Sequence, residues 1–393
     1  MVSMACGTAA ILRGNLSPRG SAGPAADAAA AAGIAVFRPQ LPTADRLLPY
    51  LRAIDAGRRY TNQGPLLERF ERRLARHFAV APERVVAVAN ATAGLTLSLL
   101  AASAAEAAGR LCIMPSWTHE ATAVAVLRAG LTPWLHDVDA VTWQLDPATV
   151  ADGIRRDPRV AHVMVTAPFG ATVDPGPWGE LAERTGVGVT IDAASGFDRL
   201  RGGPVDAVVS LHATKVLGIG EGGVVVAGGT ARAARIRDLA RLGLSETRVL
   251  PQAGMNAKLS EYAAAVGLAA LDEWPARRAS LQRLRDHYAT RLGGQDQAPR
   301  LWRPDGMSST LMVRLPRPTA AATAAALADQ GIETRRWWHA GCHRQPAFAG
   351  LPRQPLPVSE ALADSVLGLP FHTDLDAPAI DRIAAALLGP PAA

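Results

Sequence analysis

A chain of 393 residues is too long for one ordinary domain and suits one large domain with a smaller companion. Apolar residues make up 49% and charged residues 19%, a balance that permits a sizeable core and excludes a chain disordered throughout. The net charge of +6 comes without basic runs interleaved with aromatic residues, and no uncharged apolar run reaches about 18 residues, so we expect neither nucleic-acid binding nor a membrane span.

Residues 1–35 are rich in Ala, Gly, Pro and Ser and are expected to form a flexible N-terminal extension. Helical spacing of Leu and Phe follows from about residue 44 to residue 78. Short apolar runs then alternate with amphipathic stretches, which is typical of an α/β sheet with mainly parallel strands. The expected strands are 84–90, 111–115, 132–138, 162–169, 187–194, 207–211 and 222–228. The loop between the last two is too short for a crossover helix, so this pair can be antiparallel.

The pattern changes near residue 258. A long helical stretch over 258–293, interrupted at Pro275, leads to the apolar segment 311–316, an Ala-rich helix over 319–330, a Pro-rich loop and a last helix over 377–388. The sequence thus predicts a large α/β domain over residues 36–257, with a mostly parallel, helix-flanked sheet. A small C-terminal α+β domain is expected over residues 258–393.

The three cysteines are an odd number without metal-type spacing: Cys6, Cys112 and Cys342. Such a set suits a reducing compartment, so a cytoplasmic protein is expected. The sequence predicts no metal site.

Only two of the 41 Lys and Arg residues are lysines, Lys215 and Lys258. Because arginine serves almost wherever a cation is needed, a retained lysine is a candidate for chemistry that guanidinium cannot perform, such as Schiff-base formation. Lys215 lies in SLHATKVLGIGEGG (210–223), between a strand and four glycines that allow the backbone close to a ligand. The alternative is a surface lysine on a turn. Lys258 is expected to be structural.

Asp192 ends the apolar strand of VGVTIDAAS (187–195), where a carboxylate is costly unless it has a partner. A pyridinium nitrogen would be such a partner, because a nearby carboxylate favours the protonated ring. The alternative is a helix N-cap at a strand–helix junction.

A third segment, VANATAGLTLSLLAA (88–102), turns from strand to helix at Ala91–Thr92. Free amides at a helix N-terminus bind phosphate, and Thr92 adds a hydroxyl. Asn90 or Thr92 as a plain N-cap is compatible with that role.

Taken in order, these segments resemble the PLP-dependent sugar aminotransferases of the DegT/DnrJ/StrS family, from about residue 37 to residue 388. The lysine motif SLHATKVLGIGEGG is the most specific. The others are YTNQGPLLERFERRLARHF (60–78), NATAGL (90–95), PSWTHEATA (115–123), IDAAS (191–195), GMNAKLSEYAAAVGL (254–268) and GLPFH (368–372). The resemblance implies an aspartate-aminotransferase-like fold and pyridoxal 5′-phosphate (PLP) as cofactor.

Carried over position by position, the resemblance implies that Lys215 forms the Schiff base and moves protons, while Asp192 pairs with the pyridine nitrogen. Ala91, Thr92 and Ser210 would hold the phosphate. Asn256 matches an asparagine that reaches the phosphate from the neighbouring subunit, which implies a homodimer with shared active sites. Its alternative is an N-cap for a helix starting at residue 258.

Three positions depart from the family pattern. His119 stands where the family has an aromatic ring stacked on the cofactor, Ser195 replaces a Gln or His, and Ala91 replaces a turn glycine, which a negative φ permits. The implied substrate residues are Tyr60, Thr61, Asn62 and Gly64 near the start of the resemblance, and His339 and His343 in RRWWHAGCHRQPAF (335–348). The tryptophans of that segment are either substrate contacts or core.

The implied function is transfer of an amino group from L-glutamate to a nucleotide-linked keto-deoxysugar, such as a dTDP-4-keto-6-deoxyhexose. A keto-cyclitol or another natural-product ketone is an alternative acceptor. A non-catalytic PLP-binding regulator is the alternative from another class, and the presence of both Lys215 and Asp192 disfavours it.

Overall fold

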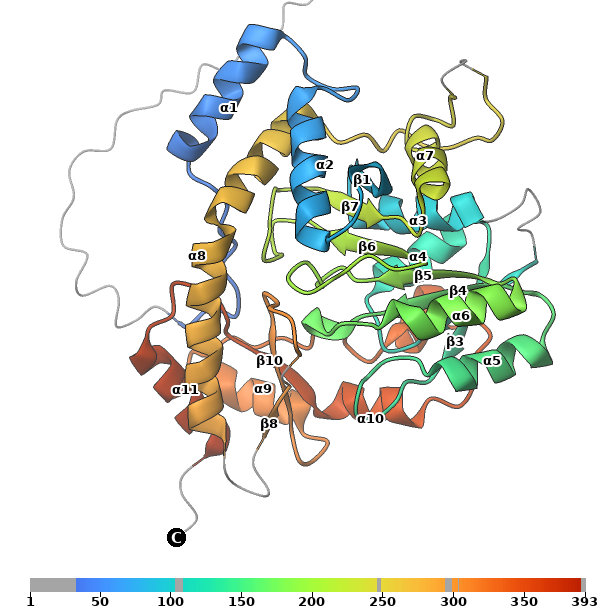
Figure 1. The fold of residues 1–393 in the computed structure, drawn as a ribbon. Coiled ribbons are helices and arrows are strands. Elements are labelled where there is room, and N and C mark those ends of the chain that lie inside the picture. Colours follow the sequence, from blue (N-terminus) through green and yellow to red (C-terminus); the bar gives the residue numbers. More distant parts are fainter. Residues whose placement is uncertain (1–32, 103–108, 246–248, 294–298, 303, 390–393) are drawn as a thin grey trace, which may run out of the picture. The chain divides into compact units, whose positions relative to one another are not determined.

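Seven strands form the central sheet of the computed structural model, which describes residues 33–102, 109–245, 249–293, 299–302 and 304–389. The strand order is β1-β7-β6-β5-β4-β2-β3 (Figure 1). Neighbouring strands from β6 to β3 are parallel, whereas β7 runs antiparallel to both β1 and β6. The mainly parallel sheet and the antiparallel last pair are both confirmed. The bounds are β1 Val85–Val88, β2 Leu111–Pro115, β3 Thr132–His136, β4 Val160–Thr166, β5 Gly188–Asp192, β6 Asp206–Ser210 and β7 Gly223–Val226.

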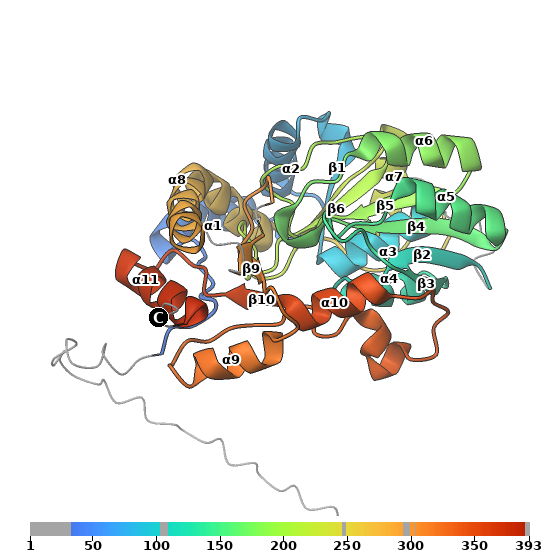
Figure 2. The same ribbon diagram turned by 90° about the horizontal axis from the view of Figure 1, so that it is seen from below.

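Helices cover both faces of this sheet, which explains why its strands are apolar throughout. In Figure 2, α5 and α6 lie on one side of the strands and α3 and α4 on the other. Alternate strand residues enter two different cores: Val163 packs in the core that includes α2, α5 and α6, and Met164 in the core that includes α3, α4 and α7. The bounds are α1 Ala44–Gly57, α2 Pro65–Phe78, α3 Ala91–Ala102, α4 Glu120–Arg128, α5 Pro147–Arg156, α6 Pro175–Thr185 and α7 Thr230–Leu239.

Side-chain caps mark where several helices begin. Asp146, Asp174, Ser260 and Asp376 each accept a backbone N–H from the first turn of the helix that follows, which satisfies an amide that has no partner within the helix. These caps are local sequence signals, so they help explain why helix starts can be found from sequence.

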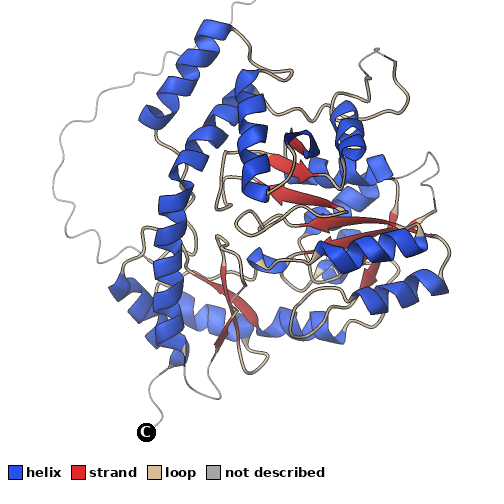
Figure 3. Cartoon of the chain, viewed as in Figure 1, coloured by secondary structure: helices blue, strands red, loops and turns tan. Residues whose placement is uncertain are grey.

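The second half of the chain adds the long helix α8 (Glu261–Leu292) and a small sheet, both drawn in Figure 3. This sheet has three antiparallel strands in the order β10-β9-β8. The expected last helix is confirmed as α11. The Ala-rich helix is slightly shorter than expected. The bounds are β8 Arg300–Leu301, β9 Leu311–Arg314, α9 Ala320–Ala328, α10 Pro357–Ser365, β10 Val366–Leu369 and α11 Ala377–Leu388.

The expected interruption at Pro275 is wrong, because α8 continues through it. Proline removes one helical hydrogen bond and costs about 3 kcal/mol inside a helix. Leu271, Trp274 and Leu281 on either side are buried in the core, and burial of such side chains contributes about 1.5–3 kcal/mol each. Packing therefore outweighs the local preference to break.

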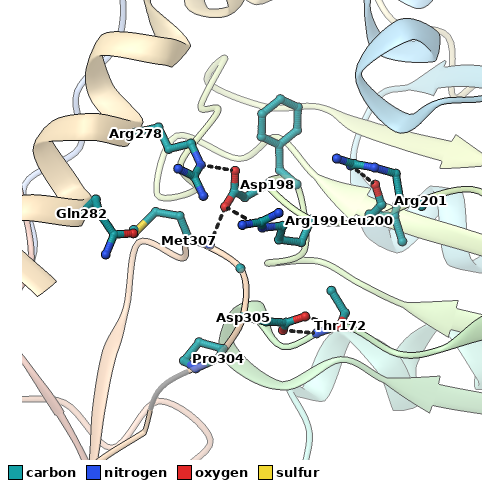
Figure 4. Close-up of polar contacts among 12 residues, drawn as sticks. Thr172, Asp198, Arg199, Leu200, Arg201, Arg278, Gln282, Pro304, Asp305 and Met307 are labelled. Carbon is teal, nitrogen blue, oxygen red and sulfur yellow. Dashed lines mark hydrogen bonds and ion pairs between the residues drawn. The ribbon is translucent and has the colours of Figure 1, made fainter. Parts of the chain in front are cut away.

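The loop after β5 is tied to the second half of the chain by Asp198 (Figure 4). This buried carboxylate accepts from Arg278 Nε of α8 at 2.6 Å and from the Met307 backbone N–H at 2.9 Å. Nearby, the Thr172 backbone N–H donates to Asp305 at 3.0 Å. These contacts fix the segment around residues 305–307 against the central sheet domain.

Residues 34–393 form one compact unit. The expected extension over residues 1–35 lies outside the described residues except for its end, where Ile34 bridges Ile332. The domain boundary near residue 257 remains a prediction. Within the part that the structure describes, no helix is both long and apolar enough to cross a membrane.

Candidate active site

Three side chains gather where neighbouring strands of the sheet end. Thr166, Asp192 and Ser210 are the last residues of β4, β5 and β6, and all three are buried. Thr166 and Asp192 are register partners across the β4–β5 pair. Because the carboxyl ends of parallel strands meet at one edge, the sheet brings these groups together where ligands bind in open α/β folds.

The loop between β6 and β7 carries Lys215 and is held in shape by its own backbone. The Ala213 N–H donates to the Gly220 carbonyl, and the Ile219 N–H to the Leu211 carbonyl. At Gly218 a Cβ would lie 2.7 Å from the Ala213 carbonyl oxygen, so only glycine allows the loop to close there. The Gly-rich motif therefore fixes the position of the lysine.

Lys215 is half-buried, and its Nζ donates to Ser195 Oγ at 3.2 Å. Burial lowers the pKa of the Lys215 ammonium below its ordinary value, and the charge of Asp192 partly offsets that shift. A lowered pKa increases the fraction of neutral amine, the form that attacks a carbonyl. Lys215 lies in a turn, as the alternative expected, but its side chain is only partly exposed, and its role as the cofactor lysine stays a prediction.

Asp192 is only 4% exposed. Its Oδ2 accepts from Thr122 Oγ1 at 2.7 Å and its Oδ1 from the Ala194 backbone N–H at 3.1 Å. Burial raises the pKa of Asp192, and these two hydrogen bonds, with His119 and Lys215, act against that rise. No helix begins after β5 within this described stretch, so the N-cap alternative is wrong.

A chain of three hydrogen-bonded threonine hydroxyls leads to Asp192. Thr122 Oγ1 lies 2.9 Å from Thr118 Oγ1, which lies 3.0 Å from Thr166 Oγ1. Each hydroxyl has one hydrogen. Since Thr122 donates its hydrogen to Asp192, Thr118 must donate to Thr122, and Thr166 to Thr118. All three donors therefore point toward the carboxylate and favour its charged form.

The start of α3 lies against the start of β7. A Cβ on Gly223 would lie 2.6 Å from the Ala91 backbone nitrogen, and Gly223 is the register partner of Ser210. This brings Ser210 to the N-terminus of α3, where Ala91 and Thr92 are the first helical residues. Ala91 is absent from the described residues with positive φ, so alanine is accommodated without strain. Asn90 Oδ1 accepts from the Ala93 N–H, which confirms its capping role.

Two predicted cofactor residues lie at the surface of this chain. The side chain of His119 is 63% exposed and caps α4, its Nδ1 accepting from the Ala121 N–H. Asn256 is exposed, and its Oδ1 accepts from Lys258 Nζ at 2.6 Å. Asn256 is not an N-cap, because α8 begins only at Glu261 and Ser260 caps it.

The predicted substrate residues Tyr60, Thr61, Asn62 and Gly64 lie in the segment before α2. Two of them contact the start of α8: the Tyr60 ring stacks on Tyr262 with the ring centroids 6.2 Å apart, and Gly64 packs against the Glu261 carboxylate. Their role in substrate binding remains a prediction.

The other predicted substrate residues differ in accessibility. His339 is exposed, whereas His343 is buried and its Nδ1 lies 2.7 Å from Ser116 Oγ, next to the end of β2. His343 also lines a cavity of about 630 Å³ with Arg344 and Arg353. Trp338 is core, since it is 8% exposed and stacks on Phe169 at 4.0 Å.

A smaller cavity of about 40 Å³ includes Lys215, two arginines that the sequence analysis missed, and His372 of the GLPFH motif. Arg38, Arg277 and His372 line it, and they come from the N-terminal segment, from α8 and from the end of the chain. The chain has 39 arginines, so nothing in the sequence distinguished Arg38 and Arg277 from the others.

Comparison with known proteins agrees with this geometry. Residues 43–388 match the model of the DegT/DnrJ/EryC1/StrS aminotransferase family. The erythromycin biosynthesis sensory transduction protein EryC1 of Saccharopolyspora erythraea is 33% identical over 340 residues, 82% of this chain and 90% of that protein. The dTDP-3-amino-3,4,6-trideoxy-alpha-D-glucose transaminase of Streptomyces venezuelae is 31% identical over 350 residues, covering 84% and 88%.

Among solved structures, DesI in the presence of its TDP-sugar product superposes with a TM-score of 0.82 at 33% identity, covering 90% of this chain and 92% of that one. The chain therefore belongs to the DegT/DnrJ/EryC1/StrS aminotransferase family and is a PLP-dependent aminotransferase.

Proposed function

We propose that Lys215 is the residue that binds PLP and that Asp192 faces the nitrogen of its ring. The observation that carries this proposal is the meeting, at one edge of the sheet, of an amine with a lowered pKa and a buried carboxylate that has donors on both oxygens. The cofactor's phosphate fits the N-terminus of α3, where Ser210 and Thr92 add hydroxyls. The residues present thus suit this cofactor.

When bound, PLP supplies an aldehyde for the amino group and a protonated ring that accepts electrons. Around it, Asp192 keeps the ring nitrogen protonated by its charge, and the threonine chain keeps that charge in place. Lys215 is the only lysine of the site and moves the proton at the reacting carbon. Ser195 holds Lys215 Nζ through a hydrogen bond.

Borohydride reduction of the holoenzyme followed by peptide mapping tests the lysine assignment. The pyridoxyl group is expected on Lys215, and with two lysines in the whole chain the assignment is unambiguous. Lys258 serves as the internal control because its Nζ is bonded to Asn256. A label on Lys258 would overturn the assignment.

We further propose that the acceptor is a nucleotide-linked keto-deoxysugar and that the donor is L-glutamate. Support comes from the relatives: one is named as a transaminase of a dTDP-linked amino sugar, and DesI was solved with a TDP-sugar product. The cavity of about 630 Å³ beside His343 is lined by Arg344, which also pairs with Glu360 of the same lining, and by Arg353, and guanidinium binds phosphate oxygens in forked geometry. The cytoplasmic location stays a prediction.

A comparison of the nucleotide-linked keto-sugar with the same keto-sugar lacking its nucleotide tests the acceptor. The linked form is expected to be better in kcat/KM by at least ~100-fold, because two or more charge-assisted contacts of about 1.5–3 kcal/mol each are otherwise lost. Equal rates would favour the keto-cyclitol alternative, in which the acceptor is a small neutral ring.

A further inference from the structure

The cavity of about 40 Å³ beside Lys215 has an unusual balance of charge. Lys215, Arg38 and Arg277 line it together with His372, and none of its lining residues is Asp or Glu. Arg38 pairs with Asp374 and the charge of Asp192 acts on Lys215, but neither carboxylate lines the cavity, so an anion inside it would reduce the repulsion among the cations. The cavity therefore has the charge of an anion site.

Arg277 is the arginine of this cavity that lies against the lysine loop. It is half-buried on α8, and its Nη1 donates to the Val216 carbonyl at 3.3 Å, a residue of the lysine loop. Burial lowers the pKa of Arg277, and Glu273 opposes that shift only through space. Among residues that the structure describes, Arg277 has no ion-pair partner, so its guanidinium keeps donors for a ligand.

Arg38 occupies a more open position. Its Nη1 lies 3.7 Å from Asp374, and the two side chains are 55% and 46% exposed. An ion pair as exposed as this one contributes little and is easily exchanged for another partner. Arg38 is thus placed to contact an anion at the entrance of the cavity, whereas Arg277 would contact it deeper inside.

The size and place of the cavity select the kind of anion. A volume of about 40 Å³ has room for roughly three waters, which is close to the size of a carboxylate group. A diphosphate is larger, and a sugar ring would separate it from the carbon that reacts beside Lys215. An amino acid carries its carboxylate on the reacting carbon itself.

We propose that this cavity binds one carboxylate group of a dicarboxylic amino donor, with Arg277 as the deep contact and Arg38 as the outer one. This inference rests on the proposed function, which names L-glutamate as the amino donor, and it assigns residues that would recognise that donor. Forked guanidinium–carboxylate contacts then orient the donor before its amino group reaches the cofactor.

Calorimetric titration of the holoenzyme with glutarate, a dicarboxylate without an amino group, tests the site. Arg277→Gln is expected to weaken glutarate binding about 10- to 100-fold, the effect of losing a charge-assisted contact. Arg38→Gln should cost less, about 2- to 5-fold, because its side chain is exposed. The control is Arg283→Gln on the same helix, an exposed arginine bonded to Ser280, which should leave binding unchanged.

Separate half-reactions identify which substrate the site serves. In the donor half-reaction glutamate leaves as 2-oxoglutarate, its amino group stays on the cofactor, and water supplies the ketone oxygen. Both arginine variants should slow this half-reaction and spare the acceptor half-reaction. Unchanged glutarate affinity in both variants, or a loss confined to the acceptor half-reaction, overturns the proposal, and the latter assigns the cavity to a diphosphate.

Two safeguards keep the outcome clear. If Arg277→Gln fails to fold, Arg38→Gln still tests the site, since an exposed side chain contributes little to stability. A wrong acceptor would appear as equal rates with linked and free keto-sugars. That result leaves glutarate binding untouched, so it is distinct from failure of this site.

Discussion

The charge of Asp192 is the result of two opposing effects at the scale of single residues. Burial favours the neutral acid, whereas donors from Thr122 and Ala194 favour the carboxylate. Thr118 and Thr166 orient the Thr122 hydroxyl through the hydrogen bonds Thr118–Thr122 (2.9 Å) and Thr118–Thr166 (3.0 Å). They therefore influence the charge of Asp192 without contacting it. The site therefore depends on residues that carry no charge.

Thr122→Val is expected to reduce PLP affinity about 10- to 100-fold through loss of a hydrogen bond to a charged group. The variant should also change how PLP affinity depends on pH. Burial already raises the Asp192 pKa, the Thr122 hydrogen bond lowers it, and valine removes that lowering. The carboxylate is then protonated at higher pH, so affinity should fall off at a higher pH on acidification, as measured by absorbance titration of the apoenzyme.

The conservative and control variants separate this effect from general damage. Thr122→Ser retains the hydroxyl and should restore the wild-type pH profile. Thr190→Val also buries a valine in place of threonine in β5, but Thr190 bonds His162 instead of Asp192. A profile shifted equally in all three variants would contradict the role given to Thr122.

At the scale of elements, the N-terminus of α2 is held by a residue from α8. Glu261 is 1% exposed, and its carboxylate accepts the backbone N–H groups of Leu66 and Leu67, both at 2.9 Å. Only glycine fits at position 64, where a Cβ would lie 2.5 Å from the Glu261 carboxyl carbon. Gly64 before α2 and Pro65 at its first position thus allow a cap from a distant helix.

Glu261→Ala is expected to lower the free energy of unfolding by about 2–4 kcal/mol, because it leaves two amides buried without acceptors. Chemical denaturation of the apoenzyme measures this loss, and Glu261→Gln should lose less because one acceptor remains. The control is Glu68→Ala in the first turn of α2. It should change the free energy of unfolding by no more than about 1 kcal/mol, since the ion pair of Glu68 with Arg72 is exposed. Equal losses at both positions would argue against the cap.

At the scale of the whole molecule, several exposed apolar side chains lie in segments near the one that carries Asn256, such as Leu242, whose N–H donates to the Met255 carbonyl. Arg241 bridges Asn256 and donates to Gln63, which links this segment to the turn before α2. Leu242, Val249, Leu250, Tyr60 and Tyr262 are each 47–60% exposed. Contiguous exposed apolar surface is typical of a subunit interface, and we expect these side chains to lie at the interface of the homodimer that the family resemblance implies.

The dimer is tested by mixing inactive variants. Lys215→Ala and Asn256→Ala subunits should each be impaired alone, and their mixed dimers contain one doubly defective site and one intact site. Random mixing should therefore restore about a quarter of wild-type activity, measured after subunit exchange. Mixtures that stay as inactive as their components, or a fully active monomer by light scattering, would contradict shared sites.

Several features could be predicted from sequence because short-range patterns encode them. The apolar runs marked all seven strands of the main sheet, and the short loop before residue 223 allowed the antiparallel pair. The rarity of lysine indicated Lys215, whose chemistry no arginine can replace. Asp192 was predicted as a site residue because a carboxylate at the end of an apolar strand is costly unless it has a partner.

Other features required the tertiary structure. Hydroxyls from Thr118, Thr122 and Thr166 form one chain only because α4 and two strand ends converge, and no spacing in the sequence records that. Pro275 breaks the local pattern, yet packing carries α8 through it. The cavity beside Lys215 joins Arg38, Arg277 and His372, which are far apart in the chain. The sequence by itself determined the elements and the reactive amine, because these depend on near neighbours, whereas long-range packing decided what surrounds that amine.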